Sequence, residues 1–269
     1  MNNERPAVTI ERLRRMKAAG ERIACLTGYD ASFGRLLDEA GVDLILVGDS
    51  LGMLVGGHET TVPVTMDEMV YHTAAVARAR PRTFLVADLP FMSYTTPEQA
   101  LANSARLMQG GGAQAVKLEG GRTQADTVRR LSEQGVPVCA HIGLTPQSVH
   151  KLGGYRVQGR LPEAARAMLE DARVLQEAGA DLLVLECVPS ALAREVSGTL
   201  AIPVIGIGAG PSCDGQVLVL YDALGITPGR VPRFARNFLT EGRDVRGALA
   251  AYVEAVKSGT FPGPEHELA

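Results

Sequence analysis

Short apolar runs recur along the chain, and turn residues followed by helical spacing of apolar positions separate them. Such runs are typical of buried strands, whereas apolar positions three or four residues apart are typical of amphipathic helices. The apolar runs cover residues 23–28, 43–49, 83–90, 113–119, 137–143, 180–186, 203–208 and 216–225. Alternation of strand and helix predicts a parallel sheet, and eight such units predict a closed (β/α)8 TIM barrel of the α/β class.

Several of the predicted helices have recognisable beginnings. Thr65 followed by Glu68 is a capping box, and Thr96, Pro97 and Gln99 combine a capping box with proline at the first helical position. Helical apolar spacing also covers residues 162–178 and 244–257. These segments are therefore expected to be helices of the barrel.

The length of 269 residues is close to the roughly 250 of one TIM barrel, so we expect a single domain over residues 1–269. Residues 9–19 predict a short helix before the first strand, with a role as a plug of the barrel floor. The tail from about residue 261 is polar and rich in proline, and is expected to be loosely ordered. Two long connections, residues 50–65 and 143–161, are expected to be lids, binding loops or subunit contacts.

Composition narrows the classes of partner. The net charge is −3, and no cluster of Lys and Arg is interleaved with aromatic residues, so nucleic acid is not an expected partner. The polar N-terminus lacks an apolar signal-peptide core, and no later stretch reaches the roughly 18 apolar residues of a membrane span. We therefore expect a cytoplasmic protein. The four cysteines are far apart in sequence and are expected to be buried free thiols.

Ionisable residues stand at the ends of five of the apolar runs: Asp49, Asp88, Glu119, His141 and Glu186. In a TIM barrel the carboxyl ends of the strands converge on one mouth, where the active sites of this fold lie. Any single acid after a strand is more often a helix N-cap or a solvated turn residue, as is expected for Asp30 and Asp222. Five together would crowd like charges into the mouth, and a bound cation would relieve that crowding.

Lys117 stands two residues before Glu119, so both side chains are expected to point to the same side of one strand. Three carboxylates without cysteine or a histidine pair favour a hard cation, Mg2+ before Zn2+. The glycine-rich run at residues 206–210 is weaker evidence, because an anion-binding turn and an ordinary tight turn explain it equally well. For His58 and His72, solvated or structural roles are expected.

The sequence resembles the ketopantoate hydroxymethyltransferase (3-methyl-2-oxobutanoate hydroxymethyltransferase) family over nearly its whole length. The segments that carry the resemblance are LTGYDASF, LVGDSLGM, TTVPVTMDEMVYH, VADLPFMSY, AVKLEGG, HIGLTPQS, LLVLECVP and PVIGIGAG. The resemblance implies transfer of a hydroxymethyl group from 5,10-methylenetetrahydrofolate to 3-methyl-2-oxobutanoate, which gives 2-dehydropantoate for pantothenate and coenzyme A biosynthesis. It also implies a homodecamer built from two pentamers.

The resemblance assigns roles residue by residue. It implies that Mg2+ is bound by Asp49, Asp88 and Glu119, and that Glu186 is the catalytic base. The residues implied to bind the 2-oxo acid are Asp49, Ser50, Asp88, Lys117 and His141. No local motif identifies the residues that bind the folate.

Two alternatives stay open at this point. One is a Mg2+-dependent lyase or mutase of the phosphoenolpyruvate mutase and isocitrate lyase group, although no loop of the K-K-C-G-H type occurs in the sequence. The other is a metabolite-binding barrel without catalytic activity, which would be expected to lack the base or a metal ligand.

Overall fold

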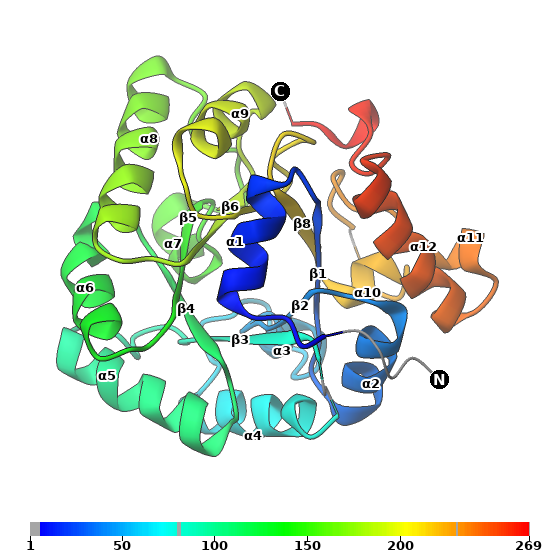
Figure 1. Cartoon of the computed structure of the whole chain (residues 1–269), viewed down its shortest axis with the longest axis horizontal. Helices are drawn as coiled ribbons and strands as arrows, with labels where there is room; N and C mark the ends of the chain where they lie inside the picture. The colour runs from blue at the N-terminus through cyan, green and yellow to red at the C-terminus, as the bar shows by residue number, and fades with distance from the viewer. Residues whose placement is uncertain (1–5, 80–81, 230, 269) are drawn as a thin grey trace.

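The computed structural model describes residues 6–79, 82–229 and 231–268, and within them eight parallel strands form a closed barrel in the order of the chain (Figure 1). The last strand pairs with the first, with Cys25 opposite Val217. The strands are β1 (Ile23–Thr27), β2 (Leu44–Val47), β3 (Phe84–Asp88), β4 (Ala115–Glu119), β5 (Val138–Gly143), β6 (Leu182–Glu186), β7 (Val204–Ile207) and β8 (Gly215–Leu218). The predicted TIM barrel is therefore confirmed.

Helices surround the barrel, and the shorter ones lie in the connections. The α-helices are α1 (Ile10–Ala18), α2 (Ala31–Ala40), α3 (Leu51–Leu54), α4 (Met66–Ala77), α5 (Pro97–Ala105), α6 (Ala125–Glu133), α7 (Val149–Leu152), α8 (Pro162–Glu177), α9 (Ser190–Thr199), α10 (Leu220–Ala223), α11 (Leu239–Gly242) and α12 (Val245–Ser258). A π-helical turn, η1 (Arg106–Gly110), continues α5, and 3-10 turns are η2 (Arg122–Gln124), η3 (Pro146–Ser148) and η4 (Pro264–His266).

The predicted helix beginnings are largely confirmed. Thr65 caps α4 in a complete capping box with Glu68. Thr96 caps α5 by accepting a hydrogen bond from the Gln99 backbone N–H, but the Gln99 side chain accepts from the N–H of Thr95 instead. The box at α5 is therefore displaced by one residue, because the Gln99 amide reaches past the cap.

The last apolar run, residues 216–225, was expected to be one strand but contains two elements. Strand β8 ends at Leu218, and α10 begins at Leu220, whose backbone N–H donates to Thr27 Oγ1 at 2.9 Å. Apolar composition alone does not separate a buried strand from a buried helix turn. The early end of β8 places Asp222 at the barrel mouth, because α10 follows the strand directly.

Helix α1 closes the amino-terminal end of the barrel (Figure 1). Its buried Leu13 and Met16 pack in one cluster with inward side chains of the strands, among them Phe84 and Val86. Thr9 caps this helix by accepting from the Arg12 N–H. The predicted helix is present, and its packing is what a role as the floor of the barrel requires. A second cluster fills the layer between the strands and the outer helices.

The tail from residue 261 differs from the loosely ordered segment that we expected. Phe261 is buried, and its ring packs edge-on against Phe238 at 5.4 Å between centroids. His266 contacts the Phe261 ring in turn, at 5.1 Å. These aromatic contacts hold a proline-rich and otherwise polar segment against the barrel, which composition alone could not reveal.

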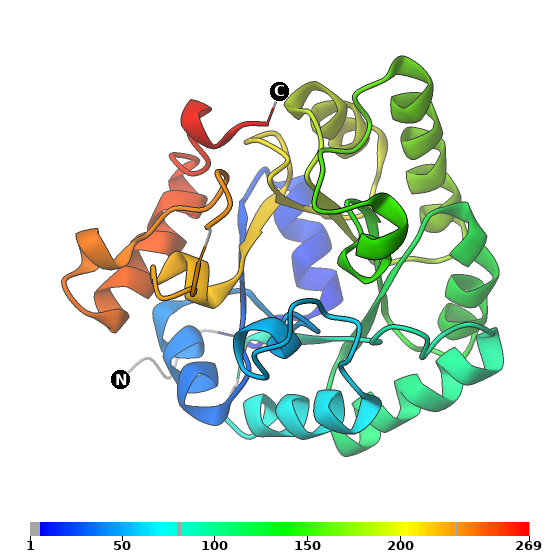
Figure 2. The same ribbon diagram turned by 180° about the vertical axis from the view of Figure 1, so that it is seen from behind.

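The two long connections both lie at the carboxyl-terminal mouth of the barrel. The first contains α3 and the second contains η3 and α7, and Figure 2 shows α3 and α7 on the side away from α1. Tyr155 of the second connection reaches Met53 of the first, with its hydroxyl 3.5 Å from the sulfur. The four cysteines are buried and free, as expected. Among the helices described, none is long and apolar enough to cross a membrane.

Candidate active site

The ionisable residues that end the strands line one cavity of about 670 Å³ at the barrel mouth. Asp88, Glu119 and Glu186 are the last residues of β3, β4 and β6, whereas Asp49 follows β2 and His141 lies within β5. Every one of them lines the cavity, and so do Ser50 and Lys117. The structure therefore brings together all seven predicted site residues.

Asp49, Asp88 and Glu119 are buried side by side, and we refer to them as the acid cluster. Lys117 neutralises part of their charge, since its Nζ lies 2.7 Å from Asp88 Oδ1 and 4.0 Å from Glu119 Oε1. Burial lowers the pKa of Lys117, but the three carboxylates outweigh burial and raise that pKa. Lys117 is therefore a cation within the acid cluster. Its side chain points to the same side of β4 as Glu119, as the spacing of two residues predicts.

Burial raises the pKa values of two carboxylates in the acid cluster, Asp49 and Asp88. Burial raises the pKa of Asp49 well above its ordinary value, and the charges of Asp88 and Glu119 raise it further. Burial also raises the pKa of Asp88, against the opposing effect of Lys117. One Asp88 oxygen, Oδ2, accepts the backbone N–H of Asp49 at 3.0 Å, which fixes the two side chains relative to each other.

His141 links the acid cluster to the predicted base. Its Nδ1 lies 3.4 Å from Glu119 Oε1, and its Nε2 lies 3.2 Å from Glu186 Oε2. Burial and the charge of Lys117 lower the pKa of His141, but the two carboxylates outweigh them and raise it to about 9. This raised pKa favours the charged form of His141 at neutral pH, in which the ring forms an ion pair with each glutamate. Nδ1 also lies 3.2 Å from Lys117 Nζ.

Glu186 lies where the barrel opens, with 15% of its side chain exposed. The next residue, Cys187, has a φ of 49°, a left-handed backbone conformation that residues other than glycine rarely adopt. Hydrogen bonds hold it there, because its N–H donates to Ile207 and its carbonyl accepts from Gln158. Strain of this kind concentrates at functional sites, where it aims a neighbouring side chain.

Two buried residues of the site were not predicted as site residues. Gln147 donates from Nε2 to Asp49 Oδ2 at 2.8 Å, and its backbone N–H donates to Glu119 Oε2 at 3.0 Å. The hydroxyl of Tyr94 donates to Gln147 Oε1 at 2.5 Å. Both residues lie in segments that carry the family resemblance, HIGLTPQS and VADLPFMSY, but neutral side chains in loops gave no signal of their own.

Three further polar residues were expected to have structural or solvated roles, and the structure agrees for two of them. Asp30 caps α2 by accepting from the N–H groups of Ser32 and Phe33, as expected. His72 has a structural contact, with Nδ1 2.7 Å from the Tyr29 carbonyl oxygen. Asp222, in contrast, is neither a cap nor a solvated turn residue, because it is buried and lines the cavity.

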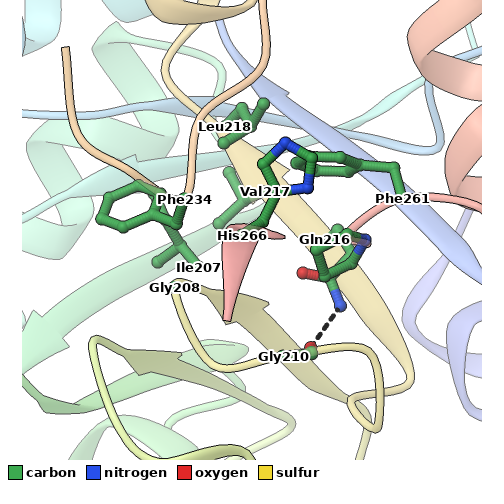
Figure 3. Close-up of a pocket in the computed structure, with 10 residues that line it drawn as sticks. Ile207, Gly208, Gly210, Gln216, Val217, Leu218, Phe234, Phe261 and His266 are labelled. Carbon is green, nitrogen blue, oxygen red and sulfur yellow. Dashed lines mark hydrogen bonds between the residues drawn. The ribbon is translucent and has the colours of Figure 1, made fainter. Parts of the chain in front are cut away.

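The glycine-rich turn after β7 has the geometry of a tight turn. Gly208 and Gly210 have φ angles of 59° and 76°. The carbonyl oxygen of Gly210 accepts a hydrogen bond from Gln216 Nε2 at 3.1 Å (Figure 3). The pocket beside it, lined by Phe234, Phe261 and other residues, has no room for a water molecule. This turn therefore supports packing of the barrel rim.

The donor set of the acid cluster fits a hard divalent cation. With Glu186, four carboxylates face two cations, Lys117 and His141, so their formal charges leave an excess of negative charge in a buried site. Among the described residues, however, no three or more His, Cys, Asp and Glu side chains stand in positions from which they could hold a metal ion together. The carboxylates are engaged by protons of Lys117, His141 and Gln147 instead.

Comparison with known proteins identifies the family. The family model described as ketopantoate hydroxymethyltransferase matches residues 7–264. The chain belongs to this family. A 3-methyl-2-oxobutanoate hydroxymethyltransferase of Alkalilimnicola ehrlichii is 62% identical over 264 residues, covering 98% of this chain and 95% of the relative. The enzyme of the same name from Burkholderia multivorans is 58% identical over 99% of this chain and 98% of the relative.

Solved structures share the fold at much lower identity. A putative phosphonomutase of Burkholderia cenocepacia superposes with a TM-score of 0.64 and 18% identity, over 80% of this chain and 94% of that one. A 2,3-dimethylmalate lyase of the PEP mutase and isocitrate lyase superfamily gives a TM-score of 0.58 and 21% identity, over 82% and 84%. The lyase alternative therefore shares the barrel architecture, whereas the sequence places the chain among the hydroxymethyltransferases.

Proposed function

We propose that this chain transfers a hydroxymethyl group from 5,10-methylenetetrahydrofolate to 3-methyl-2-oxobutanoate, giving 2-dehydropantoate in pantothenate biosynthesis. The observation that carries the proposal is the match to the hydroxymethyltransferase family over residues 7–264, together with a charged cavity that contains every implied site residue. The residue roles below extend that proposal to this chain.

The 2-oxo acid binds on the side of the cavity formed by β2 to β5. Lys117 supplies positive charge for the substrate carboxylate or its developing oxyanion. Ser50 supplies a hydrogen bond, and the Tyr29 hydroxyl, 2.9 Å from Ser50 Oγ, fixes that side chain. Glu186 lies next to this side of the cavity, because it ends β6, the strand that pairs with β5.

Asp49, Asp88 and Glu119 are the residues that would hold Mg2+. When bound, the ion would polarise the carbonyl of the 2-oxo acid and favour loss of a proton from C3. These three acids provide the hard oxygen donors that such an ion prefers, and the negative charge of the site attracts it.

Glu186 is the base that accepts the proton from C3. It lies on a strand separate from the acid cluster, and His141 orients it through the contact at 3.2 Å. The methylene carbon of the folate is bonded to both N5 and N10. The carbanion at C3 attacks this carbon, so that a carbon–carbon bond forms, one carbon–nitrogen bond breaks, and the released nitrogen takes up the proton that Glu186 removed from C3. Water then displaces the second nitrogen and supplies the hydroxyl oxygen, and its other proton goes to that nitrogen as tetrahydrofolate leaves.

The test is a mass-spectrometric product assay with both substrates and Mg2+, with and without EDTA. We expect 2-dehydropantoate, lost with EDTA and restored by added Mg2+. Glu186→Gln should abolish both product and exchange of the C3 proton for deuterium, while the 2-oxo acid still binds. Glu195→Gln, at an exposed position of α9, is the matched control and should retain activity. Absence of product from folded wild-type protein would overturn the proposed transfer, and EDTA-insensitive product would overturn the metal site.

We also propose that the chain assembles as a homodecamer of two pentamers. The proposal rests on membership of the family. Tyr71, Met92 and Leu161, which are 70%, 60% and 62% exposed, are candidate residues for subunit contacts. Sedimentation or mass photometry should give ten times the mass of one chain. A particle with the mass of a single chain at micromolar concentration would contradict the assembly.

A further inference from the structure

The cavity continues beyond the residues to which the proposed chemistry gives a role. The acid cluster, Lys117, His141 and Glu186 come from the side of β2 to β6, whereas β8 and β1 close the barrel across from β4 and β5. On that far side the lining includes Asp222, Thr227 and Thr27, among apolar side chains such as Val219 and Phe234. This half of the cavity contains a carboxylate but none of the residues that bind the 2-oxo acid.

Asp222 is held in this half by the short helix α10. The Leu220 N–H anchors the start of α10 on Thr27 of β1, and the ring of Tyr221 stacks on Tyr29 at 5.9 Å. Helix α10 lies close to the strands of the barrel, directly after β8 (Figure 2). The position of the Asp222 side chain is therefore fixed by two neighbouring strands.

Asp222 is buried, but among the described residues only one of its two carboxylate oxygens has a hydrogen-bond partner. Its relative exposure is 5%, and Oδ1 accepts the Thr227 hydroxyl at 2.5 Å. Within residues 6–79, 82–229 and 231–268, no hydrogen-bond donor is assigned to Oδ2. Burial raises the pKa of Asp222, against the opposing effect of Thr227. Oδ2 is not one of the fully buried polar atoms that lack a partner among the described residues, and Asp222 lines the cavity. A donor of a bound ligand can therefore reach this oxygen without displacing a protein contact.

The chemistry of the two substrates decides which of them this carboxylate faces. The 2-oxo acid is an anion that Asp222 would repel and Lys117 attracts. A reduced pterin, in contrast, is flat and presents two adjacent donors, the ring N3–H and the 2-amino group. Adjacent N–H donors match the two oxygens of one carboxylate, and apolar walls suit the faces of the ring.

We propose that Asp222 binds the N3–H and 2-amino edge of the pterin ring and that Thr227 positions Asp222 for this contact. The inference rests on the proposed function, because the folate is its co-substrate. With the pterin on the β8 and β1 side, the one-carbon unit points across the cavity toward the 2-oxo acid on the β2 to β5 side. The two substrates thus occupy opposite halves of one mouth.

The first test compares Asp222→Asn with wild type by titration of tetrahydrofolate in the presence of 3-methyl-2-oxobutanoate. We expect the Kd of tetrahydrofolate to rise roughly 10- to 100-fold, because a hydrogen bond to a charged acceptor is lost. Exchange of the C3 proton of the 2-oxo acid into deuterium oxide, which needs no folate, should remain within a factor of about two. Asp30→Asn, at the α2 cap outside the cavity, is the matched control and should leave both values unchanged.

The second test separates direct contact from a structural role. An analogue of tetrahydrofolate without the 2-amino group should bind wild type more weakly than tetrahydrofolate, whereas Asp222→Asn should discriminate little between them. Thr227→Val should show a smaller loss of the same kind, and it is a second variant that tests the contact without changing the Asp222 carboxylate. An unchanged Kd in both variants, or full discrimination by Asp222→Asn, overturns the inference while wild-type product formation leaves the proposed function intact. A wild type that forms no product and exchanges no C3 proton overturns the proposed function instead.

Discussion

The side-chain amide of Gln147 donates to Asp49 Oδ2 at 2.8 Å, and the same residue donates its backbone N–H to Glu119. One neutral residue thereby spaces two acids that would otherwise repel each other. Since Tyr94 fixes the amide from the other side, Gln147 is a positioning residue of the acid cluster.

Gln147→Leu should therefore reduce activity without unfolding the chain. Loss of a hydrogen bond to a buried carboxylate should lower kcat/KM roughly 10- to 100-fold. The rate of C3 proton exchange should fall with it, and the KM for the 2-oxo acid should rise. Gln158→Leu, in the same connection but outside the cavity, is the control. A fall in melting temperature with unchanged exchange would show that Gln147 is structural only.

The barrel and much of the site could be predicted from the sequence because both depend on short, regular patterns. Period and length of the apolar runs predict strands, and the barrel brings the strand ends Asp49, Asp88 and Glu186 into one mouth. Gln147 could not be predicted in this way, because it reaches the acids from a loop rather than from a strand end. Such a contact depends on the path of the whole connection.

Asp222 was interpreted wrongly for a related physical reason. Aspartate after a strand is common as a helix cap, and sequence does not reveal burial. In the structure α10 begins only two residues after β8 ends, so Asp222 turns into the mouth instead of capping a helix. The tail was misjudged because two aromatic contacts outweigh its polar composition.

Lys117 offsets the charge of the acid cluster, so its loss should be strongly destabilising. Lys117→Met removes the partner 2.7 Å from Asp88 and leaves buried carboxylates uncompensated, which costs roughly 3–5 kcal/mol in the free energy of unfolding. Mg2+ should raise the melting temperature of this variant more than that of wild type, because a cation can take over the charge of Lys117. Lys151→Met, at an exposed position, is the control for loss of a lysine. Equal Mg2+ shifts in wild type and Lys117→Met would contradict this charge argument.

Asp222→Asn should stabilise the chain at neutral pH, independently of any ligand. Burial raises the pKa of Asp222 in the folded chain above its unfolded value of about 3.9, so the folded state binds this proton more tightly than the unfolded state. The stabilising effect of protonation is complete below the unfolded pKa and is lost as the pH rises through the folded pKa. At pH 7 the charged side chain therefore weakens the fold, and the variant should melt at a higher temperature than wild type.

This stability gain has a defined pH window. It should shrink as the pH falls through the raised pKa of Asp222 toward about 4, since wild type then becomes neutral at this site as well. Melting curves at several pH values measure the difference directly. Asp30→Asn should show no gain at pH 7, because its carboxylate caps α2 favourably. A variant that melts below wild type at pH 7 would show that the Thr227 contact stabilises the charged form more than burial penalises it.

The variant Leu13→Ala tests whether α1 contributes to the stability of the barrel core. The Leu13 side chain is fully buried in the cluster that fills the amino-terminal end of the barrel, with Phe84 and Val86. Leu13→Ala removes that packing and should lower the free energy of unfolding by about 2–5 kcal/mol. Arg15→Ala, at an exposed position of the same helix, tests helix propensity alone and should change stability by less than about 0.5 kcal/mol. Because the active site lies at the opposite end of the barrel, kcat of folded Leu13→Ala should stay near wild type. A loss of activity larger than the loss of folded protein would mean that packing at the floor controls the strand ends at the mouth.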